Sequence, residues 1–121
     1  MKKTVIICSE DKLSIIEKSS INIFQYSDIA GVFYEHPYLK IITVNKNKKL
    51  IFYSLKEISK LLPPQFVVCS RSAIINLTHV AQFKSGNSNC FIELDNGEKI
   101  PVSRRKKSEI MEKMKMIYTE L

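Results

Sequence analysis

The sequence predicts a mainly β protein built from antiparallel hairpins, with one short internal helix and one C-terminal helix. Three observations lead to this fold class. Apolar residues come in short runs or alternate with polar residues, which is the pattern of β-strands. Clusters of turn-forming residues with the length of hairpin loops separate these segments. Only two stretches repeat their apolar residues at the spacing of a helix.

The predicted strands are short and follow one another closely. They are residues 4–8, 13–17, 21–24, 29–34, 38–44, 49–53, 66–69, 73–76, 80–83, 90–94 and 99–102. The segments NKNK at 45–48, SGNSN at 85–89 and DNG at 95–97 predict tight turns. The Asn-Gly pair at 96–97 is a strong reversal signal, because both residues tolerate a positive φ. We therefore expect antiparallel hairpins at these turns.

The first helix is predicted after Ser54, because Ser54 and Glu57 have the spacing of a capping box. Its apolar residues recur at helical spacing at Leu55, Ile58, Leu61 and Leu62. Pro63 and Pro64 end it, because proline cannot continue the backbone hydrogen bonds. The second helix follows Ser103. Its apolar face consists of Ile110, Met114, Ile117 and Leu121, with Met111 and Tyr118 beside them.

The composition is that of one globular domain in a reducing compartment. A chain of 121 residues with 45% hydrophobic and 26% charged residues can form its own core and does not resemble a disordered segment. Cys8, Cys69 and Cys90 lie in apolar runs without a C-x-x-C pair, which predicts buried free thiols and neither disulfides nor a metal site. No apolar stretch reaches membrane-spanning length and no signal-peptide core is present, so we expect a cytoplasmic protein.

The chain carries a surplus of positive charge. Its net charge is +7, from 19 Lys and Arg against 12 Asp and Glu. On a small domain this surplus indicates a polyanionic partner, either nucleic acid or an anionic membrane face. A role in solubility alone is the alternative interpretation.

The densest positive charge lies where the last predicted strand meets the C-terminal helix. The four residues after Ser103 are Arg104, Arg105, Lys106 and Lys107. Positive charge is unfavourable at a helix N-terminus, where the helix dipole already presents about half a positive charge. A bound anion such as a DNA phosphate removes this conflict, because free N–H groups and basic side chains both point at it. A solvated charge run is the alternative.

A second candidate is Arg71, the only charged residue in the apolar segment 66–76. It lies between two serines, which predict a break joining two buried strands. An arginine on a short loop with rigid flanks is well placed to bond O6 and N7 of a guanine together. A structural ion pair with Glu93 or Glu35 has equal weight from the residues alone.

The third candidate is the segment EHPYLK at 35–40. Pro37 fixes an extended turn before a strand. Tyr38 and Lys40 then share one face of that strand, because they are two residues apart. A tyrosine hydroxyl beside a lysine ammonium suits contact with a phosphate or a base. The alternative is a partly buried Tyr38 with a solvent-facing Lys40.

Four segments, taken in order, carry a family resemblance. They are YLKIIT at 38–43, SLKEISKLLP at 54–63, FVVCSRSAIINLTHV at 66–80 and IELDNGEKIPVSRR at 92–105. Together they resemble the LytTR family of DNA-binding domains of bacterial transcriptional regulators. That family shows a Y-[VL]-[KR]-I strand, an L-x-x-L helix ending in L-P, an R-S-x-[IV]-[IVL]-N strand pair and a final [IL]-P-V-S-R. The resemblance covers residues 21–117, and its strength lies in the order of four linked motifs.

The resemblance implies small stacked antiparallel sheets whose loops and strand ends enter successive major grooves of double-stranded DNA. By position, Arg71 matches the base-reading residue and Arg104 matches the arginine after the last strand. Lys107 matches a nearby contact to the DNA backbone, and Arg105 belongs to the same cationic run. Tyr38, or less securely its neighbour Leu39, matches the region of a third base-contacting side chain.

The resemblance also bears on the rest of the chain. Asn76 matches the asparagine of the motif, which we interpret as a turn-bonding residue and not as a DNA contact. The family domain is expected at 21–121, with 1–20 as an N-terminal strand extension of the same domain. LytTR domains often follow a receiver domain, so this chain is either a stand-alone regulator or the output half of a longer one. The family often occupies paired repeats, which is compatible with two copies on one operator.

The expected function is sequence-specific DNA binding by a transcriptional regulator without a cofactor. Enzymatic activity is not expected, because His36 and His79 lie apart from any acidic or cysteine cluster with catalytic spacing and no glycine-rich phosphate loop exists. The alternative is a protein-interaction module whose last helix docks an unidentified protein partner. Binding through phosphates should weaken steeply with salt, whereas apolar docking should not.

Overall fold

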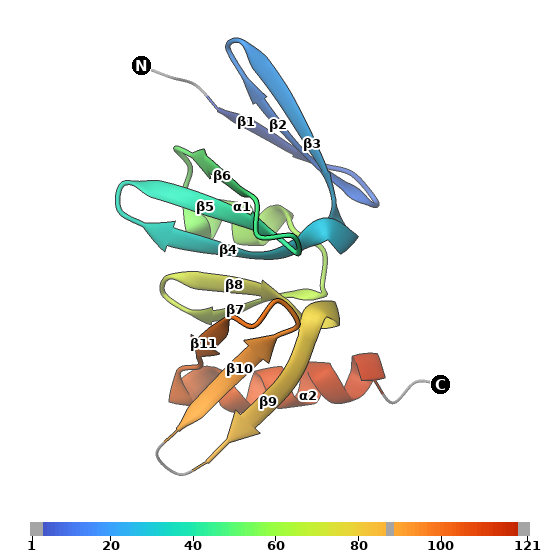
Figure 1. Ribbon diagram of the computed structural model, residues 1–121, viewed down its shortest axis with the longest axis vertical. Coiled ribbons are helices and arrows are strands. Elements are labelled where there is room, and N and C mark those ends of the chain that lie inside the picture. The colour runs from blue at the N-terminus through green and yellow to red at the C-terminus, as the bar shows by residue number, and fades with distance from the viewer. Residues whose placement is uncertain (1–3, 87–88, 119–121) are drawn as a thin grey trace.

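Three antiparallel sheets and two α-helices form the fold in the computed structural model, which describes residues 4–86 and 89–118 (Figure 1). The first sheet has the order β1-β2-β3, with β1 Val5–Cys8, β2 Lys12–Glu17 and β3 Ser20–Gln25. The second has the order β6-β5-β4-β8-β7, with β4 Ile29–Glu35, β5 Tyr38–Thr43, β6 Lys48–Ile51, β7 Phe66–Ser70 and β8 Ala73–Asn76. The third has the order β11-β10-β9, with β9 Val80–Ser85, β10 Cys90–Leu94 and β11 Lys99–Pro101. The predicted mainly β class of small stacked antiparallel sheets is confirmed.

The turns follow the predicted chemistry. Gly97 has a φ of 92° and its N–H donates to the carbonyl of Leu94 over 2.9 Å, so the DNG segment closes the β10–β11 hairpin. In the β5–β6 turn the positive φ falls on Lys46, at 68°. The predicted turn at 85–89 lies partly outside the described residues. On its described flanks, the N–H of Gly86 donates to the carbonyl of Asn89 over 2.8 Å.

The two predicted helices are present. α1 spans Leu55–Leu61, and the hydroxyl oxygen of Ser54 accepts a hydrogen bond from the N–H of Glu57 over 3.2 Å. The backbone is extended again at Leu62, before the two prolines. The second helix begins with a 3₁₀ turn, η3 (Arg104–Lys106), and continues as α2 (Lys107–Tyr118). Leu121, which the sequence placed on its apolar face, lies outside the described residues.

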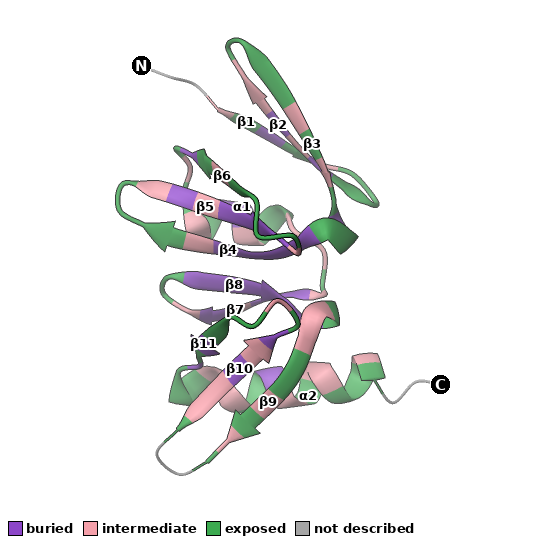
Figure 2. Cartoon of the chain, viewed as in Figure 1, coloured by how far each residue is buried: buried purple, intermediate pink, exposed green. Residues whose placement is uncertain are grey.

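The five-stranded sheet is the central layer, and its strands carry many of the buried residues (Figure 2). A core cluster lies on each of its faces. On one face the first sheet and α1 cover Val32, Leu39, Ile41, Ile51 and Ile74. On the other face the third sheet and α2 pack against Val67, Ala73 and Ile75. Burial of both faces explains why the central strands consist of nearly continuous apolar runs.

The N-terminal strands share this core. Ile6, Leu13 and Ile15 point inward and belong to the cluster that α1 covers. The Nζ of Lys49 on β6 lies 2.7 Å from the carboxylate of Glu17 on β2, which adds an ion pair between the first and second sheets. This packing supports the proposal that residues 1–20 extend the family domain and do not form a unit of their own.

Asn76 holds the end of β8 in place. Its side chain is buried, and its Nδ2 donates to the carbonyls of Tyr26 and Ile29, each over 3.0 Å. Its Oδ1 accepts hydrogen bonds from the N–H and the hydroxyl of Thr78, over 3.0 and 2.7 Å. The side chain therefore joins two 3₁₀ turns, η1 (Tyr26–Asp28) and η2 (Leu77–His79), as the interpretation of a turn-bonding residue requires.

The three cysteines are free thiols. Cys69 is fully buried, and burial raises its pKa to about 12, so its thiol stays protonated at neutral pH. Cys8 and Cys90 are only partly buried. The prediction of buried thiols is therefore correct for Cys69 and too strong for the other two, which lie on strands of the smaller sheets.

We predict that Asn76→Ala lowers the free energy of unfolding by about 1–3 kcal/mol, because buried carbonyls and the N–H of Thr78 lose their partner. Urea denaturation followed by circular dichroism measures this change. Asn45→Ala, in the exposed β5–β6 turn, is the control and should change stability by less than about 0.5 kcal/mol. Equal stability of the two variants would show that the buried amide has no such role.

Candidate nucleic-acid interface

Three chain connections lie along one side of the molecule, at the left of Figure 1. They are the β4–β5 turn, the β7–β8 turn and the connection from β11 to α2. Backbone hydrogen bonds join them: the N–H of Tyr34 donates to the carbonyl of Ser72 over 2.9 Å, and that of Ser103 donates to the carbonyl of Cys69 over 3.2 Å. All three segments that the sequence singled out are thus brought to one side, which we call the cationic edge.

Arg71 occupies the β7–β8 turn at the middle of the cationic edge. The N–H of Ser72 donates to the Oγ of Ser70 over 3.3 Å, so the two serines shape the turn that carries the arginine. Arg71 is exposed, and within residues 4–86 and 89–118 its side chain has no ion-pair or hydrogen-bond partner. The alternative, an ion pair of Arg71 with Glu35 or Glu93, is therefore wrong.

The cationic run occupies the 3₁₀ turn and the first residue of α2. Arg104 and Arg105 are exposed, and neither has a carboxylate partner among the described residues. Lys107 is half-buried at the start of α2 and also lacks such a partner there. Lys106 differs, because its Nζ lies 3.5 Å from the carboxylate of Glu109. Glu109 thus offsets part of the positive charge at this helix start, and three cations of the run remain available.

Tyr38 begins β5 at the upper end of the cationic edge. Its ring packs on Phe52, with 4.6 Å between the ring centroids, and the residue is half-buried. Sequence reasoning missed this aromatic contact. It follows from the β5–β6 register, which pairs Leu39 with Ile51 and so brings Tyr38 close to Phe52. In a separate contact at the β4–β5 turn, the hydroxyl of Tyr34 lies 2.8 Å from the Nδ1 of His36.

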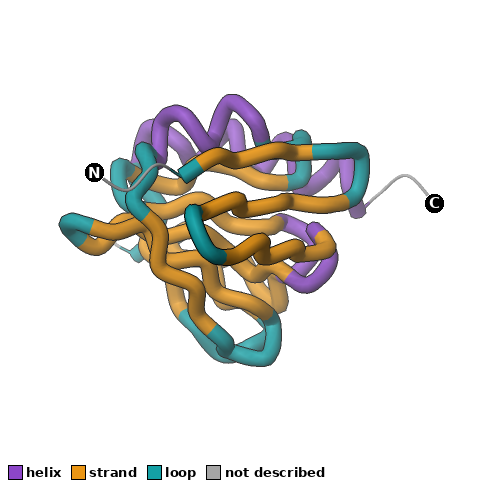
Figure 3. Tube along the Cα trace, turned by 90° about the horizontal axis from the view of Figure 1, so that it is seen from above, coloured by secondary structure: helices purple, strands orange, loops and turns teal. Residues whose placement is uncertain are grey.

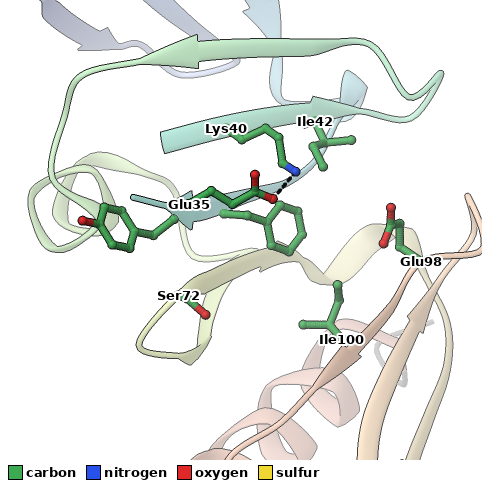
Figure 4. A pocket seen from close by; sticks show the side chains of 8 residues that line it. Glu35, Lys40, Ile42, Ser72, Glu98 and Ile100 are labelled. Atoms are coloured by element: carbon green, nitrogen blue, oxygen red, sulfur yellow. Dashed lines mark hydrogen bonds and ion pairs between the residues drawn. The ribbon is translucent and has the colours of Figure 1, made fainter. Parts of the chain in front are cut away.

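Lys40 faces a different environment from the other predicted site residues. Its ammonium forms an ion pair with the carboxylate of Glu35, and its side chain is 15% exposed. Figure 4 shows the two side chains pointing toward each other, with Glu98 and Ile100 facing them from the β10–β11 hairpin. They line a pocket of about 220 Å³. The structure thus confirms that Lys40 and Tyr38 lie on the same side of β5 but not that Lys40 faces solvent.

The ion pair changes the acidity of its carboxyl group. The hydrogen bond from Lys40, and then its positive charge, hold the pKa of Glu35 below the ordinary value. A carboxyl group with a lowered pKa in the folded state contributes stability at neutral pH, and this contribution is lost as the pH falls through that pKa.

The family follows from the comparison with known domains. Residues 19–115 match the model of the LytTr DNA-binding domain. The chain belongs to the LytTR family. Among solved structures it is similar to the LytTr DNA-binding domain of a Bacillus cereus protein described as a methyl-accepting/DNA response regulator. The TM-score is 0.73 at 22% sequence identity, over 88% of this chain and 98% of that chain, which shows a shared fold. No curated protein sequence matches the chain.

Membership of the LytTR family makes the chain a DNA-binding domain, in a family that is not a family of enzymes. The fold brings His79 to an acidic residue that lies sixteen positions away in the sequence. Its Nδ1 lies 2.9 Å from the carboxylate of Asp95, and its Nε2 contacts the carbonyl of Ser27, so the ring is held between η1 and the β10–β11 turn. In the described part of the chain, no helix combines the length and apolar character needed to cross a membrane.

The C-terminal helix of this LytTR domain uses its apolar face inside the molecule. Ile110 is fully buried, and Met114 and Ile117 pack against the second core cluster. The hydroxyl of Tyr118 donates to the carbonyl of Leu77. The protein-interaction alternative requires this apolar face to be free. Its described residues are instead occupied by contacts within the domain.

We predict that Lys40→Met raises the pKa of Glu35 toward the ordinary carboxyl value, because the hydrogen bond and the charge that lower it are removed. An NMR titration of the side-chain carboxyl carbon measures this pKa. Lys49→Met breaks the ion pair with Glu17 and is the matched control, since it should leave Glu35 unchanged. The assignment fails if Glu35 titrates identically in Lys40→Met and in the parent chain.

Proposed function

We propose that this LytTR domain is a sequence-specific transcriptional regulator that contacts successive major grooves of double-stranded DNA through loops and strand ends. One observation carries the proposal. Two backbone hydrogen bonds join the Arg71 turn and its strand to the β4–β5 turn and to the residue before the 104–107 run, and among the described residues Arg71, Arg104, Arg105 and Lys107 have no carboxylate partner. Unpaired cations from separate segments on one side fit a surface lined by phosphates.

We assign base recognition first to two turns of the central sheet, β4–β5 and β7–β8, which both lie at the cationic edge. Arg71 has a free guanidinium on a short turn between buried strands, which suits bidentate bonding to a guanine. Tyr38 lies at the neighbouring turn with its ring supported by Phe52, so its hydroxyl has a defined position. Arg104, after the last strand, is the third side chain in this set, and it supports a second groove contact.

Contacts to the DNA backbone are assigned to Arg105 and Lys107. Both lie at the start of the C-terminal helix, where N–H groups and the helix dipole favour an anion. Lys40 remains a prediction with weaker support, because it must leave Glu35 before it can meet a phosphate.

The wider setting of this domain is also part of the proposal. The family often occupies paired repeats, so the proposal includes two copies on a repeated operator. It also allows a further protein partner at the exposed surface. The proposal includes no cofactor. Since a regulator must reach the chromosome, we propose that it acts in the bacterial cytoplasm.

We predict that Arg71→Ala lowers discrimination between the target site and random DNA by roughly 1–3 kcal/mol, the contribution of a bidentate base contact. The target is first obtained by selecting bound sequences from random DNA at two salt concentrations. Competition gel shifts then compare the parent with Arg71→Ala and with Arg71→Lys. The lysine variant keeps the charge but loses the planar fork, so it should lose discrimination and keep most non-specific affinity. Full discrimination by either variant would refute the assigned role.

We predict that Lys107→Ala weakens binding to all DNA sequences alike and reduces the slope of log affinity against log salt by about one. The slope is measured by fluorescence anisotropy over a salt series. Lys12→Ala is the charge-matched control, because Lys12 lies on the first sheet at the far end of the molecule from α2 (Figure 1). A loss confined to the target sequence would instead place Lys107 on a base.

A further inference from the structure

The first sheet has a second apolar face that points away from the rest of the domain. While Ile6, Leu13 and Ile15 enter the core, the alternate residues on the same strands face outward. The register forms two rows on this outer face: Val5, Ile16 and Ile21 in one, and Ile7, Ser14 and Ile23 in the other. Val5, Ile7, Ile21 and Ile23 are 42%, 51%, 64% and 61% exposed.

This outer face is unusual for a sheet that meets water. An antiparallel sheet with one buried face normally presents polar side chains on the other. Here five of the six side chains in the two rows are branched aliphatic ones, and four of them are largely exposed. Their exposed surface amounts to a few hundred Å², a size at which apolar patches on soluble proteins often serve binding.

Charges at the two ends of the outer face give it a direction. The β1–β2 turn, at one end, carries the exposed carboxylates of Glu10 and Asp11. The β2–β3 turn, at the other end, carries exposed Lys18, while the neighbouring Glu17 is turned inward to Lys49. Among the described residues, the side chains of Glu10, Asp11 and Lys18 form no ion pair or hydrogen bond. One end is thus acidic and the opposite end basic, although Lys12 moderates the acidic end.

We propose that a second copy of this chain packs against the outer face, with the strands of the two first sheets antiparallel across the interface. In this two-fold arrangement the row of Val5, Ile16 and Ile21 in each copy meets the row of Ile7, Ser14 and Ile23 in the other, and the two sheets face each other as in a β-sandwich. Lys18 of each copy then meets Glu10 and Asp11 of the other. A parallel arrangement would instead bring Lys18 against Lys18.

The composition of the outer face favours a second copy over a lipid bilayer. Surfaces that dock into a membrane interface are enriched in tryptophan and tyrosine, whereas the two rows contain only aliphatic side chains and Ser14. The position of the face also leaves the cationic edge open. Figure 3 looks down onto the end of the molecule formed by the first sheet, while the three connections of the edge lie along the side.

Sedimentation equilibrium of the whole chain tests the proposal, because a patch of this size should give weak and reversible association. We expect the average mass to rise from monomer toward dimer between about 10 μM and 1 mM. The double variant Ile21→Thr/Ile23→Thr keeps β-branched residues on β3 and should weaken dimerisation at least about tenfold. Leu50→Thr replaces a comparably exposed residue on β6 and should leave the dimer unchanged. Circular dichroism melting curves show that each variant is folded.

A charge exchange tests the antiparallel orientation. Lys18→Glu should weaken the dimer, and adding Glu10→Lys and Asp11→Lys to the same chain should restore it, because each end again meets an opposite charge. No restoration would overturn the orientation. A parent chain that stays monomeric up to 1 mM would overturn the second copy as the occupant. Binding of a monomeric parent to phosphatidylglycerol vesicles, lost in Ile21→Thr/Ile23→Thr, would overturn it in favour of a membrane.

Discussion

The central constraint on this molecule is that both faces of its five-stranded sheet are packed. The first sheet with α1 covers one face, and the third sheet with α2 packs on the other. A sheet packed in this way can present little to a partner except the turns at the ends of its strands. The rigid strands on both sides then restrict the movement of each turn, so the backbone that carries Arg71 needs little further ordering on binding. Burial of both faces is therefore the reason why we place DNA binding at the edge of the sheet.

The positive charge that the cationic edge offers to a partner depends on which of its cations lack an internal carboxylate partner. Lys106 has Glu109 and Lys40 has Glu35, and these pairs lie beside the unpaired residues. A paired cation must give up its carboxylate before it can bind a phosphate, and the freed carboxylate then repels the DNA. An unpaired cation such as Arg105 has no such penalty. The distribution of carboxylates therefore shapes the edge as much as the distribution of basic residues does.

Most of the fold could be predicted from the sequence, because its signals are local. The DNG turn, the Ser54 cap and the alternation of apolar residues each act within a few positions, and short hairpins keep strand partners close in sequence. The contact of Tyr38 with Phe52 depends instead on the register of β5 against β6. The choice between a free and a paired Arg71 depends on where distant carboxylates fall in space. Sequence alone left both open.

The first sheet has two apolar faces, and the sequence pattern alone does not predict which of them enters the core. Alternation predicts strands at 4–8, 13–17 and 21–24, but apolar residues occur at both alternating sets of positions in these strands. The face that carries Ile6 and Ile15 enters the core, because α1 and the central sheet lie on that side. The opposite face is left without a partner inside the described chain. An aliphatic face that the fold does not use raises the free energy of the solvated monomer, so an assembly that covers it is stabilised by the same effect that builds the core.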